Sequence, residues 1–310
     1  MQSFFNKKFK SKNQFVYKNE KTGIELWIKR EDLIHPFVSG NKFRKLKYNL
    51  LQAKSQNVNQ ILTFGGAFSN HIAATAKACE MIKIPSIGII RGEELGEDLP
   101  KILSQNKTLD FAVNSGMTLQ FVDRSTYRQK SEMPIVQEIL QEKPSTLIIP
   151  EGGTNELAIR GCQEILTEKD DIFDIICAPL GTGGTFSGLV EASKNHQQLI
   201  GFPALKGNFL NTEIQKYTSK TNWMLNNDFH FGGYAKINSE LVEFINNFKK
   251  QYQIQLDPIY TGKMLFGIIQ LIKEGYFSKN TRILAIHTGG LQGISGMNNV
   301  LDKKGLEKLH

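Results

Sequence analysis

The sequence has few cysteines, no long hydrophobic run and no block of charge of one sign. Its three cysteines, Cys79, Cys162 and Cys177, lie far apart without a C-x-x-C pair, which argues against a disulfide framework and a zinc site. Cys79 and Cys177 stand among apolar or small residues, which predicts buried core thiols. No run approaches the ~18 apolar residues of a membrane-spanning helix, and the N-terminal segment lacks the apolar core of a signal peptide. We therefore expect a cytoplasmic protein with no membrane partner.

Several classes of protein are disfavoured by motifs that the sequence lacks. The formal net charge is +8, but the basic residues are scattered and form no RNP motif or zinc finger, so we expect no nucleic-acid partner. The six histidines show no metal-ligand spacing, so we expect no metal. A P-loop lysine motif and a G-x-S-x-G elbow are missing, which argues against a P-loop nucleotidase and a serine hydrolase. The net positive charge is still compatible with a small anionic ligand, which it would attract.

What the sequence does contain is a repeated pattern in which a short apolar run ends in a Gly pair. Such runs are typical of strands buried on both faces, and helical patterns follow two of them, at 70–82 and 185–195. Strands that alternate with helices indicate an α/β fold with parallel sheets, which bind ligands beyond the carboxyl ends of the strands. With 310 residues, the chain can form one large or two modest domains. The four runs lie within 60–70, 146–155, 174–188 and 282–290.

The segment "GTGGT" (181–185) is the strongest candidate for an anion site. A Gly-rich turn that leads into a helix lets backbone N–H groups converge on a phosphate, and the helix dipole assists. A dinucleotide fingerprint would need glycine where Phe186 stands, so a single phosphate fits better. The alternative is a plain strand–helix turn.

Other candidate residues have structural alternatives of their own. Lys42 in "SGNKFRK" is either a nucleophilic amine or part of a solvated basic helix start. The segment "FSNH" (68–71) either caps a helix or holds a carboxylate or phenolate at the helix start. Tyr260 alone would be a packing residue, and Tyr234 lies in a glycine-containing loop that suits a cleft. A lysine amine, a monophosphate cup and polar groups at a helix start are together typical of a pyridoxal-phosphate site.

Taken together, these motifs resemble those of the fold-type II pyridoxal-phosphate enzymes. The specific resemblance is to the family of 1-aminocyclopropane-1-carboxylate deaminase and D-cysteine desulfhydrase. The motifs occur in the family's order over about residues 29 to 290, and it is their combination that is specific. They are "KREDL" with "GNKFRKL" (29–46), "GGAFSNH" (65–71), "PEGGTNELAIRG" (150–161), "GTGGTFSGL" (181–189), "LDPIYTGKM" (256–264) and "IHTGG" (286–290).

The resemblance implies that pyridoxal 5′-phosphate is the cofactor and assigns residues to each part of it. Lys42 would bond to its aldehyde and move protons, and Lys45 would help to hold its phosphate. Asn70 would face the phenolic oxygen, and Thr288 would meet the pyridine nitrogen. The phosphate would lie against the backbone of Gly181, Thr182, Gly183, Gly184 and Thr185.

The resemblance also assigns the amino-acid substrate. Ser69, Asn70 and His71 would receive its carboxylate at the start of a helix. Tyr234 and Tyr260 would lie near the reacting carbon. The residues expected to be catalytic are Lys42, Ser69, Tyr234 and Tyr260.

One position departs from the family pattern. The cyclopropane deaminases have Tyr-Glu-Gly-Lys where this chain has Tyr260-Thr261-Gly262-Lys263. A carboxylate there would favour a protonated pyridine, whereas Thr261 provides no negative charge. We therefore expect β-elimination from D-cysteine, which gives pyruvate, ammonia and sulfide. The alternatives are cyclopropane deamination, β-replacement, racemisation and a protein that binds the cofactor or an amino acid without catalysis.

The domain organisation is likewise implied by the resemblance, because composition shows no boundary. A larger cofactor-binding domain would combine residues 1–45 and 145–310, with a smaller α/β domain, residues 46–144, inserted. Each would contain an open parallel sheet, with the cofactor in the cleft between them, as in the tryptophan synthase β-like fold type II. A homodimer is also implied.

Overall fold

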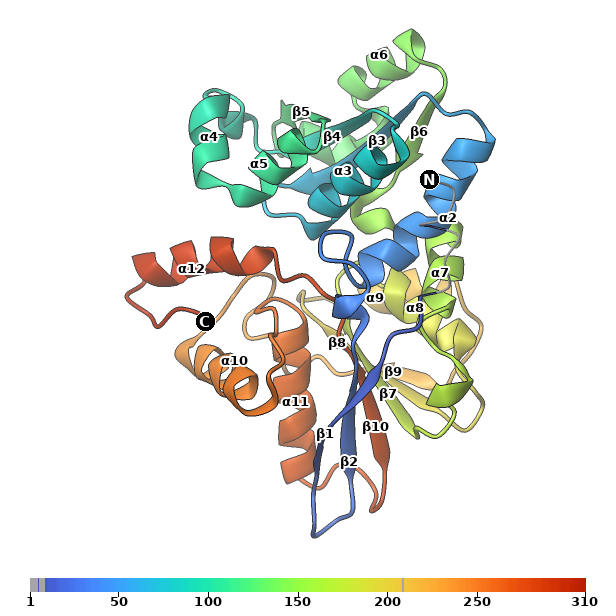
Figure 1. Ribbon diagram of the computed structural model, residues 1–310, viewed down its shortest axis with the longest axis vertical. Coiled ribbons are helices and arrows are strands. Elements are labelled where there is room, and N and C mark those ends of the chain that lie inside the picture. Colours follow the sequence, from blue (N-terminus) through green and yellow to red (C-terminus); the bar gives the residue numbers. More distant parts are fainter. Residues whose placement is uncertain (1–4, 6–8, 208) are drawn as a thin grey trace.

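The computed structural model describes residues 5, 9–207 and 209–310, and the chain in this part forms two separate sheets (Figure 1). The six-stranded sheet has the order β1-β2-β10-β7-β8-β9, so the first two strands of the chain pair beside its last one. All its neighbours are parallel except β1 and β2. The strands are β1 (Asn13–Lys18), β2 (Glu25–Lys29), β7 (Ile175–Leu180), β8 (Gln198–Pro203), β9 (Trp223–Leu225) and β10 (Arg282–Ile286).

The four-stranded sheet occupies the other half of the molecule, in the upper part of Figure 1. Its order is β5-β4-β3-β6, and every neighbouring pair is parallel. The segment that forms it falls between the two parts of the chain that form the larger sheet. Its strands are β3 (Gln60–Gly66), β4 (Ser86–Arg91), β5 (Met117–Val122) and β6 (Thr146–Ile149).

Helices cover both faces of each sheet, because successive side chains of a buried strand point to opposite faces. In β10, Ile283 and Ala285 pack into one core cluster, whereas Leu284 and Ile286 pack into another. In β3, Ile61 packs against α2 and α3, whereas Leu62 faces the opposite cluster. The helices are α2 (Asn41–Ser55), α3 (Asn70–Ile82), α4 (Leu99–Gln105), α5 (Lys107–Asn114), α6 (Pro134–Glu142), α7 (Glu156–Gln163), α8 (Gly184–Ala192), α9 (Phe209–Gln215), α10 (Ser239–Tyr252), α11 (Thr261–Lys273) and α12 (Gly293–Lys303).

Short 3₁₀ helices complete the regular structure. The fourth of them, η4, follows β6 directly and carries the Gly pair of that strand end to the centre of the molecule. They are η1 (Glu31–Leu33), η2 (Glu93–Leu95), η3 (Thr126–Glu132), η4 (Glu151–Gly153) and η5 (Glu168–Asp170).

The predicted α/β fold with two parallel sheets is confirmed, and the predicted strands and helices lie where the sequence pattern put them. The exception is the β1–β2 pair, which is antiparallel because the turn at residues 19–24 is too short for a crossover. The buried Cys79 and Cys177 thiols are confirmed as well. The domain boundaries stay a prediction, and the one at 45/46 falls within α2.

Candidate active site

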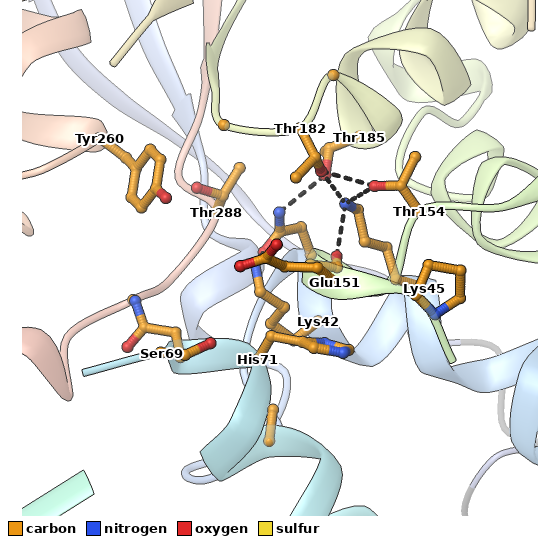
Figure 2. A pocket seen from close by; sticks show the side chains of 18 of the residues that line it. Lys42, Lys45, Ser69, His71, Glu151, Thr154, Thr182, Thr185, Tyr260 and Thr288 are labelled. Carbon is orange, nitrogen blue, oxygen red and sulfur yellow. Dashed lines mark hydrogen bonds between the residues drawn. The ribbon is translucent and has the colours of Figure 1, made fainter. Parts of the chain in front are cut away.

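A cavity of about 1200 Å³ lies where the carboxyl ends of β3, β4, β6, β7 and β10 meet between the two sheets (Figure 2). It brings together almost all the residues that the sequence predicted. Gly184 is the exception, because it lies behind the lining as the first residue of α8. The predicted residues that line the cavity are Lys42, Lys45, Ser69, Asn70, His71, Gly181, Thr182, Gly183, Thr185, Tyr234, Tyr260 and Thr288.

Lys42 stands in the first turn of α2, and this turn is fixed against the end of β10. Gly40 precedes the helix with φ 58°, and a Cβ there would lie 2.0 Å from the Thr288 carbonyl oxygen, so only glycine permits the approach. The Asn41 backbone N–H donates to the same oxygen at 3.3 Å. The Lys42 ammonium donates to Asn41 Oδ1 at 3.1 Å. Burial lowers the pKa of Lys42 to about 8, which makes a neutral amine accessible near physiological pH.

Lys45 lies one turn further along α2 and joins two loops at the floor of the cavity. Its Nζ donates to the Gly152 carbonyl oxygen and to Thr154 Oγ1, both at 2.9 Å, and to Thr182 Oγ1 at 3.2 Å (Figure 2). Burial, followed by the charge of Lys42, lowers the pKa of Lys45 to about 7. Because the three hydrogens of the Lys45 ammonium already bond to these acceptors, a direct bond to an anion would replace one of them. The negative charge of the anion would favour the charged form of Lys45.

The glycine turn before α8 has the geometry of an anion cup. Gly183 has φ 82°, and a Cβ on Gly184 would lie 2.7 Å from Thr154 Cγ2. The backbone N–H groups of residues 182–185 have no hydrogen-bond partner among the described residues. These N–H groups lie at the N-terminal end of α8, where the helix dipole favours negative charge. Asn41 closes the side of the cup by donating from Nδ2 to Thr185 Oγ1 at 2.8 Å.

The start of α3 offers a second set of unpaired N–H groups. Ser69 is the N-cap, and its Oγ accepts from the Ile72 N–H at 3.3 Å, so the capping interpretation of this residue is correct. Its hydroxyl hydrogen stays available to a ligand. The backbone N–H groups of Asn70 and His71 have no partner in the described part of the chain. The Asn70 Oδ1 atom is buried without a partner, so this amide is unsatisfied unless a ligand bonds to it.

The ring of His71 is held in one tautomer. Thr63 Oγ1 donates to the Ile149 carbonyl oxygen at 2.8 Å, so it can only accept from His71 Nε2, 2.8 Å away. Nε2 therefore carries the hydrogen and Nδ1 is an acceptor, buried without a partner among the described residues. Burial, and then the charges of Lys42 and Lys45, hold the pKa of His71 well below its usual value. The ring is neutral, so a carboxylate here would bond to backbone N–H groups and not to the ring.

Tyr234 and Tyr260 stand together on the opposite side of the cavity, with ring centroids 6.3 Å apart. Burial raises the pKa of both hydroxyls, most strongly at Tyr260, so both stay protonated at neutral pH. The Tyr234 loop is anchored by Lys263, whose Nζ donates to the carbonyl oxygens of His230 at 2.9 Å and Gly233 at 2.8 Å. Tyr234 itself is 45% exposed at the rim of the cavity.

Asp257 fixes the turn that carries Tyr260. Its buried carboxylate accepts from the backbone N–H groups of residues 259, 260 and 261, at 2.8–2.9 Å, and from Thr261 Oγ1 at 2.6 Å. Thr261 is fully buried and does not line the cavity. The sequence predicted that Thr261 brings no negative charge to the pyridine, and in the structure its hydroxyl donates to Asp257. At the end of β10, the side chain that does line the cavity is that of Thr288.

Other residues that shape the site were not predicted. Gly152 and Thr154 follow one of the Gly-pair strands, so their motif was recognised, but their bonds to Lys45 join segments more than 100 residues apart. Asn41 was visible as the residue before Lys42. Asp257 could have been suspected as a capping residue before a helix. Nothing in the sequence indicates that Lys263 anchors the Tyr234 loop.

The residues present fit pyridoxal phosphate. Two sets of unpaired N–H groups, at the starts of α3 and α8, provide donors for a carboxylate and for a phosphate. A lysine with a pKa of about 8 lies in the cavity between them, and the unsatisfied Asn70 amide lies beside it. A Cβ on residue 184 would displace Thr154, one of the side chains at the floor of the cup, so glycine at this position keeps the cup in its present shape. Such a set is suited to a reaction at the α-carbon of an amino acid.

The chain belongs to the family of pyridoxal-phosphate dependent enzymes, whose family model matches residues 16–289. It is 30% identical over 293 residues to a protein of Pyrococcus abyssi provisionally named 1-aminocyclopropane-1-carboxylate deaminase, covering 88% of this chain and 86% of that one. It is 29% identical to a mitochondrial protein of Arabidopsis thaliana named bifunctional D-cysteine desulfhydrase/1-aminocyclopropane-1-carboxylate deaminase, covering 88% of this chain and 74% of that one.

A solved structure supports the same assignment. The crystal structure of an ACC deaminase homologue superimposes with a TM-score of 0.78 at 27% identity, covering 95% of this chain and 94% of that one. The predicted family, fold type and cofactor are confirmed, and the protein is a pyridoxal-phosphate-dependent enzyme. In the part of the chain that the structure describes, no helix is long and apolar enough to cross a membrane.

Proposed function

We propose that the enzyme catalyses β-elimination from D-cysteine, in which D-cysteine and water give pyruvate, ammonia and hydrogen sulfide. The observation that supports this choice is the polar group at the end of β10. The side chain that lines the cavity there is the Thr288 hydroxyl, while the buried carboxylate of Asp257 is used by backbone N–H groups and by Thr261. A hydroxyl next to the pyridine nitrogen favours a neutral ring, and simple elimination needs less electron withdrawal than opening a cyclopropane.

The residues of this chain take distinct parts in that reaction. Pyridoxal phosphate, when bound, supplies an aldehyde for the substrate amine and a ring that withdraws electrons from Cα. The N–H groups of Asn70 and His71 bind the substrate carboxylate and so orient Cα towards Lys42. Neutral Lys42 removes the Cα proton, the Cβ–S bond breaks, and sulfur leaves with the electron pair. The protonated Tyr260 hydroxyl donates to this sulfur, and the resulting aminoacrylate is hydrolysed to pyruvate and ammonia.

Deamination of 1-aminocyclopropane-1-carboxylate is the second candidate. Both relatives described above carry that activity in their names, and one of them carries D-cysteine desulfhydration as well. The same residues would bind the carboxylate and exchange protons, but ring opening would give 2-oxobutanoate and ammonia without sulfide.

The test is a substrate panel with the purified, cofactor-loaded enzyme. D-cysteine, L-cysteine, β-chloroalanine and the cyclopropane acid are assayed for sulfide, keto acid and ammonia. We expect sulfide and pyruvate in equal amounts from D-cysteine, and none from a Lys42→Ala variant that still folds. If the cyclopropane acid gives 2-oxobutanoate while D-cysteine gives no sulfide, the ranking of the two candidates is reversed.

The site roles assigned above, the domain boundaries, the homodimer and the cytoplasmic location are part of this proposal. Borohydride reduction followed by peptide mass analysis tests the first of them, because it should fix the cofactor to the peptide containing Lys42. Attachment to Lys45 or Lys263 would contradict the assignment. Sedimentation of the loaded enzyme tests the dimer.

A further inference from the structure

Arg91 is a positively charged residue at the edge of the cavity, and it has no role in the reaction proposed above. It ends β4, lines the main cavity and also lines a neighbouring hollow of about 690 Å³. Its guanidinium makes no hydrogen bond or ion pair with any residue that the structure describes, and it lies 5.8 Å from the centroid of the Tyr127 ring. Arginine offers a planar set of donors that matches carboxylates and phosphates.

The carboxylates near Arg91 are engaged elsewhere. Glu151 accepts from Lys130 Nζ at 2.8 Å and from the Tyr127 hydroxyl at 2.9 Å. Glu94 faces Arg124 at 3.8 Å. The hollow is lined by four cations (Arg91, Arg124, Arg128, Lys130) and two carboxylates (Glu94, Glu151), a difference of +2. The charge of Arg91 is thus left for a ligand.

The backbone of Lys130 has an unusual conformation. Its φ of 51° and ψ of −117° are normally reserved for glycine, and its ammonium lies 3.5 Å from the Tyr127 ring centroid. Strain of this kind is often retained where it serves a site. Here it places Lys130 against Glu151, so that this carboxylate does not neutralise Arg91.

The position of Arg91 relates it to the substrate. Arg91 pairs with Gly66 in the sheet, three residues before Ser69, and its charge lowers the pKa of Tyr234 against the larger raising effect of burial. The guanidinium lies over Gly66, with one nitrogen 3.8 Å from the place of a Cβ there, and Arg91 lines the same cavity as the start of α3 and Tyr234. A substrate whose carboxylate bonds to the start of α3 can therefore direct its side chain towards Arg91.

We propose that Arg91 forms a subsite for a negatively charged group on the substrate side chain, so that the enzyme binds amino acids with an anionic side chain in preference to their neutral isosteres. This inference rests on the proposed carboxylate site at the start of α3. It does not depend on which bond is broken afterwards.

The test compares ligands that differ only in charge. Aspartate and asparagine of each hand are titrated into the cofactor-loaded enzyme, with the cofactor absorbance reporting the dissociation constant, and succinate and succinamate are compared as inhibitors. We expect the charged member of at least one hand, and succinate, to bind about tenfold tighter, as one charge-assisted hydrogen bond allows. Added salt should reduce the difference because Arg91 is exposed.

Variants assign the effect to one residue. Arg91→Gln should abolish the preference while leaving the affinity for asparagine and the melting temperature unchanged, and Arg91→Lys should retain part of it. Arg128→Gln is the matched control, because Arg128 lines only the neighbouring hollow. Equal binding of the charged and neutral members by the wild type, no binding of aspartate or succinate, or a preference that survives in Arg91→Gln would each overturn the proposal.

The outcome is separable from that of the D-cysteine assay. An Arg91-dependent preference without sulfide formation would support the subsite and refute D-cysteine elimination. Sulfide formation from D-cysteine without an Arg91-dependent preference would support D-cysteine elimination and refute the subsite.

Discussion

Replacing Gly184 with alanine tests whether the turn before α8 is an anion cup or only a turn. The added Cβ would lie 2.7 Å from Thr154 Cγ2 and 2.8 Å from Thr154 Oγ1, closer than real Cβ contacts. Thr154 must then move, and it is one of the three acceptors that hold Lys45. The perturbation is therefore local to the floor of the proposed phosphate site.

The expected magnitude follows from the cost of overpacking, which is ~1–3 kcal/mol for a well-packed site. The cofactor-free enzyme can relax by displacing the Thr154 loop, whereas binding the phosphate requires the loop to return. Most of the cost should thus appear in binding, where ~1.4 kcal/mol is a factor of ten. We expect cofactor affinity to fall roughly ten- to hundredfold, measured by titrating the apoenzyme, with little change in its melting temperature.

A double-mutant cycle identifies the clash. Thr154→Ala removes both close atoms, so the double variant should bind the cofactor more tightly than the two single effects predict. Gly293→Ala is a suitable control, because a Cβ there meets nothing within 4 Å. Wild-type affinity in Gly184→Ala would show that the turn has no part in phosphate binding, and strictly additive losses would show that Thr154 is not the obstacle.

Three further predictions concern the lysines and the histidine. Because the pKa of Lys42 is lowered to about 8, the neutral amine forms as pH rises through this value. The rate at which the apoenzyme binds the cofactor, measured by stopped-flow absorbance, should therefore increase through about pH 8 and then level off. A rate that continues to rise towards the ordinary lysine pKa would contradict this prediction. Lys263→Met should remove the two side-chain hydrogen bonds to the His230 and Gly233 carbonyl oxygens and so loosen the Tyr234 loop. We expect KM for the amino acid to rise while cofactor affinity stays unchanged, and a change in cofactor affinity alone would refute the anchoring role. Nitrogen NMR should show His71 neutral with its hydrogen on Nε2 as pH falls below the usual histidine pKa, and protonation near that value would contradict the tautomer.

The parts of the fold that the sequence predicted are those with a buried strand followed by a Gly pair. In β3, β6, β7 and β10 a continuous apolar run identifies the strand, and the glycines mark the turn beyond it. The same strand ends carry the site, because parallel strands direct their carboxyl ends to one edge. For this reason most of the candidate residues could be predicted without coordinates.

The strands β1, β2, β4, β5, β8 and β9 could not be predicted in this way. Strands β1 and β5, each at an edge of its sheet, mix buried and partly exposed positions, and β4, β5, β8 and β9 end without a Gly pair. The hydrogen-bond partner of Thr261 could not be predicted for a related reason. The family pattern has a glutamate at this position, which directs attention to the cofactor, whereas the Thr261 hydroxyl donates to Asp257, four residues earlier in the chain. Such a contact depends on the path of the backbone, which spacing alone does not reveal.

The arrangement of the two anion sites explains why a lysine on α2 is suited to act between them. The start of α3 belongs to the four-stranded half and the start of α8 to the six-stranded half, so a ligand that bonds to both joins the two sheets. α2 contacts elements of both halves, packing its apolar residues against α3 and lying along α7. Its first turn is fixed to β10 by the Gly40 approach to Thr288. Lys42 is therefore fixed relative to the proposed phosphate cup, while the proposed carboxylate site at the start of α3 belongs to the other half. Any relative movement of the sheets would change the distance from Lys42 to Cα, so we expect the proton transfer to depend on the closure of this cavity.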